Sequence, residues 1–295
     1  MTPGDLPVYA SPLATRYATP AMLENFGDRR RALLWRDLWI ALAEGERALG
    51  VPITAAQVER LKASRDALDF ARVEALEAEL RHDVMAHIRH FGEQAGGDAA
   101  GIIHLGATSC FVADNAELVM IRDGLELLMD RLYVAIRQLR DFARAHRARA
   151  CQAYTHFQPA QLTTVGKRAC LWAQDLALDL EGLAALVERL PLRGLKGTTG
   201  TQASFLALLD GDHQRVRALD RHVCEAMGFR ASIPVSGQTY TRKIDCWVLA
   251  ALSDVCSSAA KLAVDLRLLS HKREVEEPFG ARQVGSSAMA YKRNP

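Results

Sequence analysis

Three long stretches of the sequence repeat apolar side chains every three or four residues. They run from Leu118 to Ala143, from Val165 to Leu190 and from Ile244 to Leu269. This spacing places the apolar side chains on one face of an α-helix, and each stretch is longer than an ordinary globular helix. Since three such helices cannot cover all of one another's apolar faces, we expect more chain or other subunits to complete a bundle.

Shorter helices are predicted before these three. One runs from Arg29 to Leu49 and stops at Gly50, a residue type that commonly follows a helix end. The next begins at a capping box formed by Thr54 and Gln57. Two further helices are expected over residues 67–79 and 82–94.

Composition agrees with a soluble helical protein. Of the 295 residues, 49% are hydrophobic and 24% are charged, which is ordinary for a globular chain. The net charge of +2 gives no reason to expect a nucleic-acid partner. We therefore predict an all-α fold, with an N-terminal helical domain over residues 1–110 and an incomplete long-helix bundle domain over residues 111–295.

The sequence offers no membrane or export signal. Its start, MTPGDLPVYA, lacks a basic region followed by an apolar run. The most apolar segment, CWVLAALSDVCSSAAKLAV, contains Asp254 and Lys261, so we expect it to be too short and too polar to cross a bilayer. None of the six cysteines forms a C-x-x-C pair, so we expect reduced thiols, no metal framework and a cytoplasmic location.

Polar motifs lie at the predicted helix entrances. Thr108 and Ser109 precede the first long helix, where they either cap it or present hydroxyl and N–H groups to a carboxylate. His156 is expected just before the second long helix, with Pro159 in the first turn of that helix. This histidine is either structural or a general acid or base, because imidazole exchanges protons near neutral pH.

Two other polar motifs are ambiguous on their own. The segment Arg81–Asp83 opens a helix, and a salt bridge with a cap accounts for it. A metal site built from His82, His87 and His90 is a weak alternative, because no carboxylate or cysteine joins them at ligand spacing. The pair Arg16–Tyr17 lies in a proline-flanked loop and suits a phosphate or a base only if other residues place it in a site.

The segment GSSAMAYKRNP, Gly285–Pro295, is much more specific. It resembles the signature loop of the fumarase/aspartase superfamily, with Ala290 where that family usually has proline. Together with SPLATRYATP, RHDVMAH, GIIHLGATSC, THFQPAQLTTVGKR, GLKGTTGTQASF and SGQTYTRK, it is similar to the adenylosuccinate lyases of the animal type. The motifs follow one another in the family's order from Ser11 to Pro295.

The resemblance implies a carbon–nitrogen lyase of purine and AMP biosynthesis. Such enzymes release fumarate from adenylosuccinate and from the succinyl-carboxamide imidazole ribotide by β-elimination, without a metal or organic cofactor. It implies that Ser286 is the base, that His156 is the acid and that Lys292 stabilises the serine alkoxide. The residues matching those that bind the succinyl carboxylates are Thr108, Ser109 and Gln238. The residues matching those that bind the nucleotide are Arg16, Tyr17, Arg81, His82 and Asp83.

The family resemblance also implies a cytoplasmic homotetramer whose active sites take residues from three subunits. The family continues well beyond the signature loop, so residues 1–295 are expected to be incomplete and inactive alone. Two alternatives remain at this point. One is a non-catalytic fragment that associates with full-length subunits. The other is a sister lyase acting on argininosuccinate, aspartate or malate, against which Arg16–Tyr17 and Tyr291–Arg293 argue.

Overall fold

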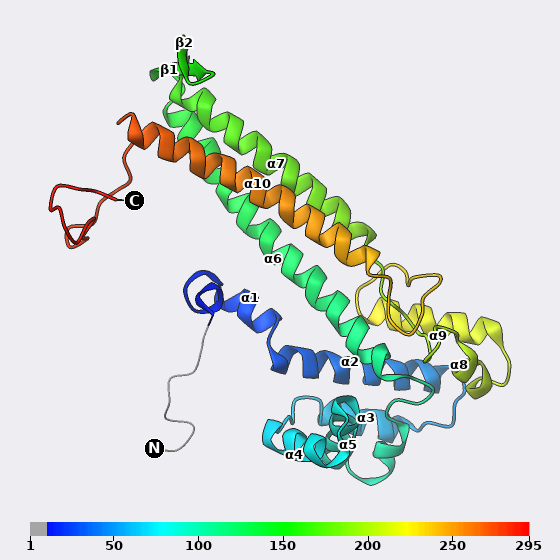
Figure 1. Cartoon of the computed structure of the whole chain (residues 1–295). Coiled ribbons are helices and arrows are strands. Elements are labelled where there is room, and N and C mark those ends of the chain that lie inside the picture. The colour runs from blue at the N-terminus through cyan, green and yellow to red at the C-terminus, as the bar shows by residue number, and fades with distance from the viewer. Residues whose placement is uncertain (1–10, 295) are drawn as a thin grey trace, which may run out of the picture. The chain divides into compact units, whose positions relative to one another are not determined.

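A computed structural model describes residues 11–294 (Figure 1). Residues 1–10, on which the expectation of no export signal rests, and residue 295 lie outside the described part. The chain forms two compact units. The first comprises the described residues up to Arg131 together with Ala184–Trp247, and the second comprises Leu132–Leu183 and the described residues from Val248. The two units are defined by contacts between residues and do not test where domains begin. The predicted domain boundary at residue 110 therefore stays a prediction.

The first unit consists of short and medium helices. Its core forms around α2, where Leu38, Trp39 and Leu42 are fully buried and Trp39 stacks on Phe91 at a centroid distance of 6.1 Å. A π-helical turn covers Leu13–Tyr17 and a 3-10 helix covers Gly97–Ile102. The α-helices wholly within this unit are α1 (Pro20–Asn25), α2 (Asp28–Ala48), α3 (Ala55–Ala63), α4 (Phe70–Leu80), α5 (Asp83–Ala95), α8 (Ala203–Leu208) and α9 (His213–Ala226).

The predicted helix signals in this unit are confirmed, with one shift. Gly50 follows α2 with a left-handed φ of 91°, and Thr54 and Gln57 form the capping box of α3 in both directions. The helix expected from residue 67 begins later, at Phe70. The delay has a local cause, because the Asp69 side chain accepts the N–H of Arg72 and so caps α4 at that point.

The three predicted long helices are confirmed as α6 (Ser109–Ala145), α7 (Val165–Arg189) and α10 (Lys243–His271). In the second unit, the C-terminal part of α6 packs with α7 and α10 around Ala143, Ala169, Trp172 and Leu269 (Figure 1). The indole N–H of Trp172 donates to the Asp265 carboxylate at 2.8 Å. The apolar faces of the three long helices therefore pack against one another here, as their periodicity predicted.

The prediction of a helical fold is confirmed, and one small hairpin interrupts the helices within the described residues. Strand β1 (Ala150–Thr155) pairs antiparallel with β2 (Gln158–Thr164). Pro159 lies in β2 opposite Tyr154, and not in the first turn of α7. The helix begins only at Val165, because the Thr164 hydroxyl accepts the N–H of Lys167 at 3.1 Å and caps it there.

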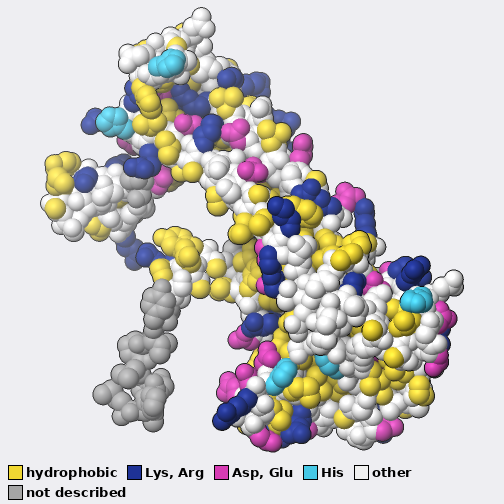
Figure 2. All heavy atoms as spheres, turned by 45° about the vertical axis from the view of Figure 1, so that its right-hand side comes forward, with side chains coloured by type: hydrophobic (Ala, Val, Ile, Leu, Met, Phe, Trp, Pro, Cys, Tyr) yellow, Lys and Arg dark blue, Asp and Glu magenta, His cyan; other side chains and the backbone are white. Residues whose placement is uncertain are grey.

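The long helix α10 corrects a second expectation. It has 29 residues and a mean hydropathy of 1.4 over its most apolar window, so by length and composition alone it could cross a membrane. The expectation that it is too short and too polar was wrong. No residue of that window is buried in the single chain, and Leu249 is 64% exposed. Figure 2 shows one face of the whole chain, on which exposed hydrophobic side chains are interspersed with charged ones.

Candidate active site

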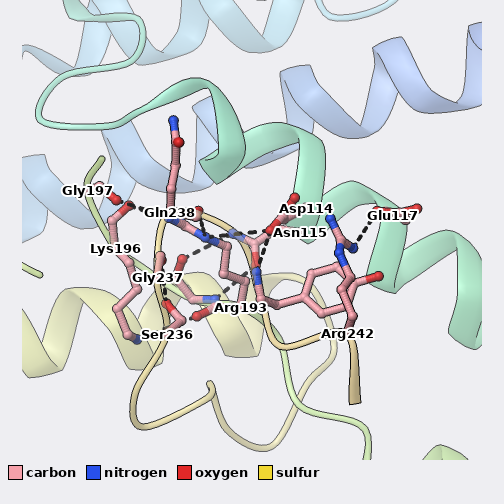
Figure 3. Close-up of polar contacts among 12 residues, drawn as sticks. Asp114, Asn115, Glu117, Arg193, Lys196, Gly197, Ser236, Gly237, Gln238 and Arg242 are labelled. Carbon is pink, nitrogen blue, oxygen red and sulfur yellow. Dashed lines mark hydrogen bonds and ion pairs between the residues drawn. The ribbon is translucent and has the colours of Figure 1, made fainter. Parts of the chain in front are cut away.

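Two loops of the first unit are held against the N-terminal part of α6 by buried polar side chains (Figure 3). Asn115 of α6 is fully buried, and its amide group makes two hydrogen bonds to the backbone of Gly194. It accepts the Gly194 N–H at 2.9 Å and donates to the Gly194 carbonyl at 3.2 Å. Because both bonds reach one residue, Asn115 fixes the backbone on either side of Gly194, where the loop 194–202 begins.

The guanidinium of Arg193, which is completely buried, joins the two loops. Its Nε donates to the Gln238 carbonyl at 2.8 Å. Its two terminal nitrogens donate to the carbonyls of Lys196 and Gly197 at 3.0 and 3.1 Å. Burial lowers the pKa of Arg193, while the nearby Asp114 carboxylate opposes that shift. One side chain thus supplies the hydrogen-bond donors that hold the loop 194–202 to the loop 234–241.

Asp114 also holds the loop 234–241, as an acceptor where Arg193 is a donor. Its carboxylate accepts the N–H of Tyr240 at 2.7 Å and lies 3.9 Å from Arg193 Nε. Burial raises the pKa of Asp114, and burial also raises the pKa of Tyr240, whose hydroxyl donates to Asp245 at 2.6 Å. Gly200, with a left-handed φ of 81°, lies directly against the Ser236 carbonyl, where a side chain would collide.

Gln238, predicted to bind a substrate carboxylate, is held by its backbone and exposes its side chain. Its carbonyl is fixed by Arg193, while the residue itself is exposed. In Figure 3 its amide extends away from the buried guanidinium. The amide is therefore available for a ligand, and its backbone is rigidly placed.

His82 and Ser109, both predicted site residues, are brought together. The His82 Nδ1 accepts the N–H of Met85 at 3.3 Å and so caps α5, and its Nε2 lies 3.5 Å from the Ser109 hydroxyl. When Nδ1 accepts, the neutral ring carries its proton on Nε2 and can donate to Ser109. The Asp83 carboxylate lies 3.5 Å from the same Nδ1, so the expected cap is present, while an ion pair with Asp83 would require a protonated ring. Thr108, the residue before α6, is buried.

His104 is a histidine of this region that the sequence analysis did not select. The Trp39 indole N–H donates to its Nδ1 at 2.8 Å, and its backbone has a left-handed φ of 70°. Burial, with a smaller contribution from His82, lowers the pKa of His104 to about 4. The ring is therefore neutral at pH 7, with its proton on Nε2. Its only sequence signal was its place in the GIIHLGATSC motif.

The two other histidines of the weak metal hypothesis have structural contacts. The fully buried His90 accepts the N–H of Asp69 through Nε2 at 3.0 Å. His87 packs edge-on against Trp35 at 5.0 Å, and burial lowers its pKa to about 4. Within residues 11–294, no group of three or more His, Cys, Asp or Glu side chains is placed to hold a metal ion.

The remaining predicted nucleotide-binding residues of the first unit lie at element ends. Arg16 and Tyr17 lie in the π-helical turn, with the guanidinium carbon 6.0 Å from the Tyr17 ring centroid and the Tyr17 side chain largely exposed. Arg81 ends α4 in a left-handed conformation, with φ of 52°.

His156 lies in the second unit, at the tip of the hairpin and not at a helix entrance as predicted. His156 and Phe157 both have left-handed φ values, 53° and 58°, as a type I′ hairpin turn requires. The imidazole lines a cavity of about 550 Å³ whose other lining residues include Lys167, Arg168 and Lys272. The predicted acid is therefore exposed beside a cluster of cationic side chains.

Ser286 and Lys292 lie in one tightly folded loop of the same unit. The Ser286 hydroxyl oxygen accepts the N–H groups of Ala288 and Met289 at 3.3 and 3.2 Å. The N–H of Lys292 donates to the Met289 carbonyl at 3.1 Å, and Gly285 lies against the Lys292 carbonyl. The loop thus directs two backbone donors at the hydroxyl oxygen, where they would also stabilise a negative charge.

Comparison with known families decides the relationship. A family model described as "Lyase" matches residues 15–295. The chain belongs to this lyase family. It is 50% identical over 288 residues to the adenylosuccinate lyase of Schistosoma mansoni and 51% identical over 290 residues to that of Saccharomyces cerevisiae. Each match covers 97% of this chain and 60% of the relative, so the lyase chain described here spans about 60% of the length of these relatives.

Solved structures confirm the fold of this lyase family member. A fumarate lyase from Mesorhizobium sp. BNC1 superposes with a TM-score of 0.74 at 23% identity, over 90% of this chain and 59% of that chain. A β-carboxy-cis,cis-muconate cycloisomerase from Acinetobacter calcoaceticus sp. ADP1 gives the same TM-score at 20% identity, over 88% of this chain and 59% of that chain. The predicted similarity to the adenylosuccinate lyases is confirmed by sequence, and the long-helix architecture by structure.

Proposed function

We propose that the whole protein releases fumarate from adenylosuccinate by β-elimination, giving AMP, and from the succinyl-carboxamide imidazole ribotide in the same way. The observation that supports this most is identity of about 50% to adenylosuccinate lyases along 97% of the chain. The activity is proposed for the full-length protein, because the chain spans about 60% of those relatives.

In the proposed reaction, Ser286 removes the proton from the carbon next to a succinyl carboxylate. A hydroxyl is a weak base unless its alkoxide is stabilised. The N–H groups of Ala288 and Met289, which already point at this oxygen, support that role. Lys292 adds a positive charge in the same loop. The electron pair left on carbon is delocalised into the carboxylate and then expels the nitrogen.

His156 is the proposed acid that protonates the departing nitrogen. Its exposed position at the hairpin tip, on a cavity with Lys167 and Lys272 in its lining, suits a proton donor beside an anionic substrate. The elimination turns the C–H electron pair into the C=C bond of fumarate, and the C–N pair leaves with the nitrogen that His156 protonates. Since no electrons enter or leave, positioned charges and hydrogen bonds suffice for each step without a cofactor.

The substrate is proposed to bind through its two anionic parts. The succinyl carboxylates are assigned to Thr108, Ser109 and Gln238. Of these, Gln238 presents a free amide and Ser109 faces the His82 ring. The nucleotide part is assigned to Arg16, Tyr17, Arg81, His82 and Asp83.

We further propose a cytoplasmic homotetramer in which subunits share active sites. The apolar window of α10, none of which is buried in the single chain, supports burial against other subunits. Sedimentation of the purified full-length protein without detergent tests this point. A single tetrameric species is expected, and a monomer, or a protein that partitions into membranes, would contradict it.

A substrate panel tests the reaction. The full-length protein is mixed separately with adenylosuccinate, argininosuccinate, aspartate and malate, and fumarate is followed by absorbance. Fumarate is expected from adenylosuccinate at a rate far above that from the other three compounds. Turnover of argininosuccinate alone would show that the protein is a sister lyase, and no turnover of any compound would contradict the proposal.

A further inference from the structure

The hairpin that carries His156 needs support from outside itself. An isolated two-stranded hairpin is at best marginally stable in water. Here the ladder from Ala150–Thr164 to Thr155–Gln158 is interrupted between Gln152 and Tyr154, and the Phe157 side chain beside His156 is 75% exposed. The direction in which the imidazole points is therefore set by whatever fixes β1.

One carboxylate, that of Glu274, connects β1 to the start of α7. Its Oε1 accepts the Tyr154 hydroxyl at 2.9 Å, and its Oε2 accepts Arg168 Nη1 at 3.1 Å. The other terminal nitrogen of Arg168 donates to the Gln152 carbonyl at 2.7 Å. Because β1 supplies Gln152 and Tyr154, the strand is held at two points through a single Arg–Glu pair.

These contacts are partly shielded from water. The side chains of Arg168 and Glu274 are 15% and 23% exposed, which strengthens their attraction relative to a fully exposed pair. The hydrogen bond to Glu274 raises the pKa of Tyr154, so the phenol stays protonated and keeps donating. The Lys272 ammonium lies 4.2 Å from the centre of the Tyr154 ring and adds a cation–π contact.

Glu274 is itself anchored by the way α10 ends. Arg273 adopts a left-handed φ of 60°, its N–H donates to the Ser270 carbonyl, and the N–H of Glu274 donates to the Leu269 carbonyl, both at 3.0 Å. This pair of bonds is the Schellman helix end. Val275 then packs against the apolar cluster that contains Leu269. The carboxylate therefore projects from a fixed backbone.

We propose that Glu274 is a positioning residue for the reaction. Through Tyr154 and Arg168 it holds the hairpin so that His156 is presented to the departing nitrogen. This role rests on the proposed function, since it acts through the proposed acid. The segment that follows Glu274 leads to the Ser286 loop, so the same anchor also fixes the point from which that loop departs.

The test compares three variants of the full-length protein. Glu274→Ala removes both acceptors, and Glu274→Gln keeps one carbonyl oxygen that can accept from Tyr154 or Arg168. Glu277→Ala is the matched control, since Glu277 is an exposed glutamate of the same segment. The measurements are hydrogen–deuterium exchange of amides 150–164, kcat and KM for adenylosuccinate, and the pH dependence of kcat.

For Glu274→Ala, exchange of the hairpin amides should rise about tenfold while exchange in the middle of α7 stays unchanged. We expect kcat to fall roughly tenfold to a hundredfold with KM within about twofold, because a misplaced acid affects the transition state more than binding. The limb of the pH–rate profile that depends on His156 should weaken. Glu274→Gln should recover part of both effects, and Glu277→Ala should behave as wild type.

Two results would overturn the proposal. If hairpin exchange in Glu274→Ala equals that in Glu277→Ala, the carboxylate does not hold the hairpin. If exchange rises but kcat and the pH profile do not change, the hairpin's position does not matter for the reaction. A wild-type protein that turns over none of the four panel substrates would instead show that the proposed function has failed, and with it the catalytic part of this role. The exchange measurement would still decide the contact.

Discussion

Glu46 is the buried group whose ionisation should cost this protein the most stability. It lies in α2 with no exposed surface, and neither carboxylate oxygen has a hydrogen-bond partner within the described residues. Burial raises the pKa of Glu46 to about 8, from 4.5 in an unfolded chain. The folded state therefore binds this proton more tightly than the unfolded state does.

The sign of the pH effect follows from that difference. Below pH 4.5 the group is protonated in both states and has no effect. As the pH rises from 4.5 to 8, the unfolded chain gains stability by ionising while the folded chain stays neutral, so folding stability falls. At about 1.4 kcal/mol for each pH unit, the loss by pH 7 is roughly 3 kcal/mol for each subunit.

Glu46→Gln removes the ionisation and keeps the shape of the side chain. It should stabilise the full-length protein by roughly 3 kcal/mol at pH 7 and by almost nothing at pH 4.5, since a neutral acid and an amide leave similar polar groups buried. The thermal midpoint at pH 7 should rise by roughly 5 °C. Glu126→Gln, at an exposed position on α6, is the control and should change nothing. A loss at pH 7 would show that Glu46 is ionised and paired in the folded protein, and a gain of the same size at pH 4.5 and pH 7 would show that its ionisation is not the cause.

Three further outcomes are expected. His104, with its pKa lowered to about 4 from 6.5, contributes stability that is fully present above pH 6.5 and lost as the pH falls towards 4. His104→Asn should therefore flatten the acid side of a plot of thermal midpoint against pH, whereas the exposed His213→Asn should not. His156→Gln should remove one limb of the pH–rate profile, and a variant that keeps both its rate and that limb would make His156 structural. Mixing inactive Ser286→Ala and His156→Gln subunits should restore about a quarter of the activity if one site takes these residues from different chains. No recovery after verified subunit exchange would place both in one chain.

The helices could be predicted because their signals are local. The 3.6-residue periodicity placed the long helices, and the Thr54 capping box placed α3. The hairpin could not be predicted, because Pro159 carries the same signal at a helix start as in an exposed strand. Its type I′ turn is formed by His156 and Phe157, neither of which is the Asn or Gly that usually marks such a turn. The hydropathy of α10 exceeds the prediction because the two charged residues, Asp254 and Lys261, stand in a run that is otherwise strongly apolar.

The candidate site residues that lie in sequence motifs could be predicted from the sequence. The buried residues that hold the loops of the site in place could not. Arg193, Asp114 and Asn115 act through bonds to residues 45, 126 and 79 positions away in the sequence. No local pattern reveals such pairing, and a buried arginine is unexpected without its partners. Glu274 is similar, because its partner Tyr154 lies 120 positions away.

The central claim is that Ser286 is the base of an adenylosuccinate-cleaving lyase. The most direct measurement is fumarate release from adenylosuccinate by the full-length protein and by its Ser286→Ala variant, together with equilibrium binding of the substrate to the variant. We expect turnover at an ordinary enzymatic rate of about 10 per second for the wild type. The variant should bind adenylosuccinate with nearly unchanged affinity while its kcat falls by at least about a thousandfold. A variant that retains a tenth of the wild-type kcat would contradict the assignment of Ser286 as the base.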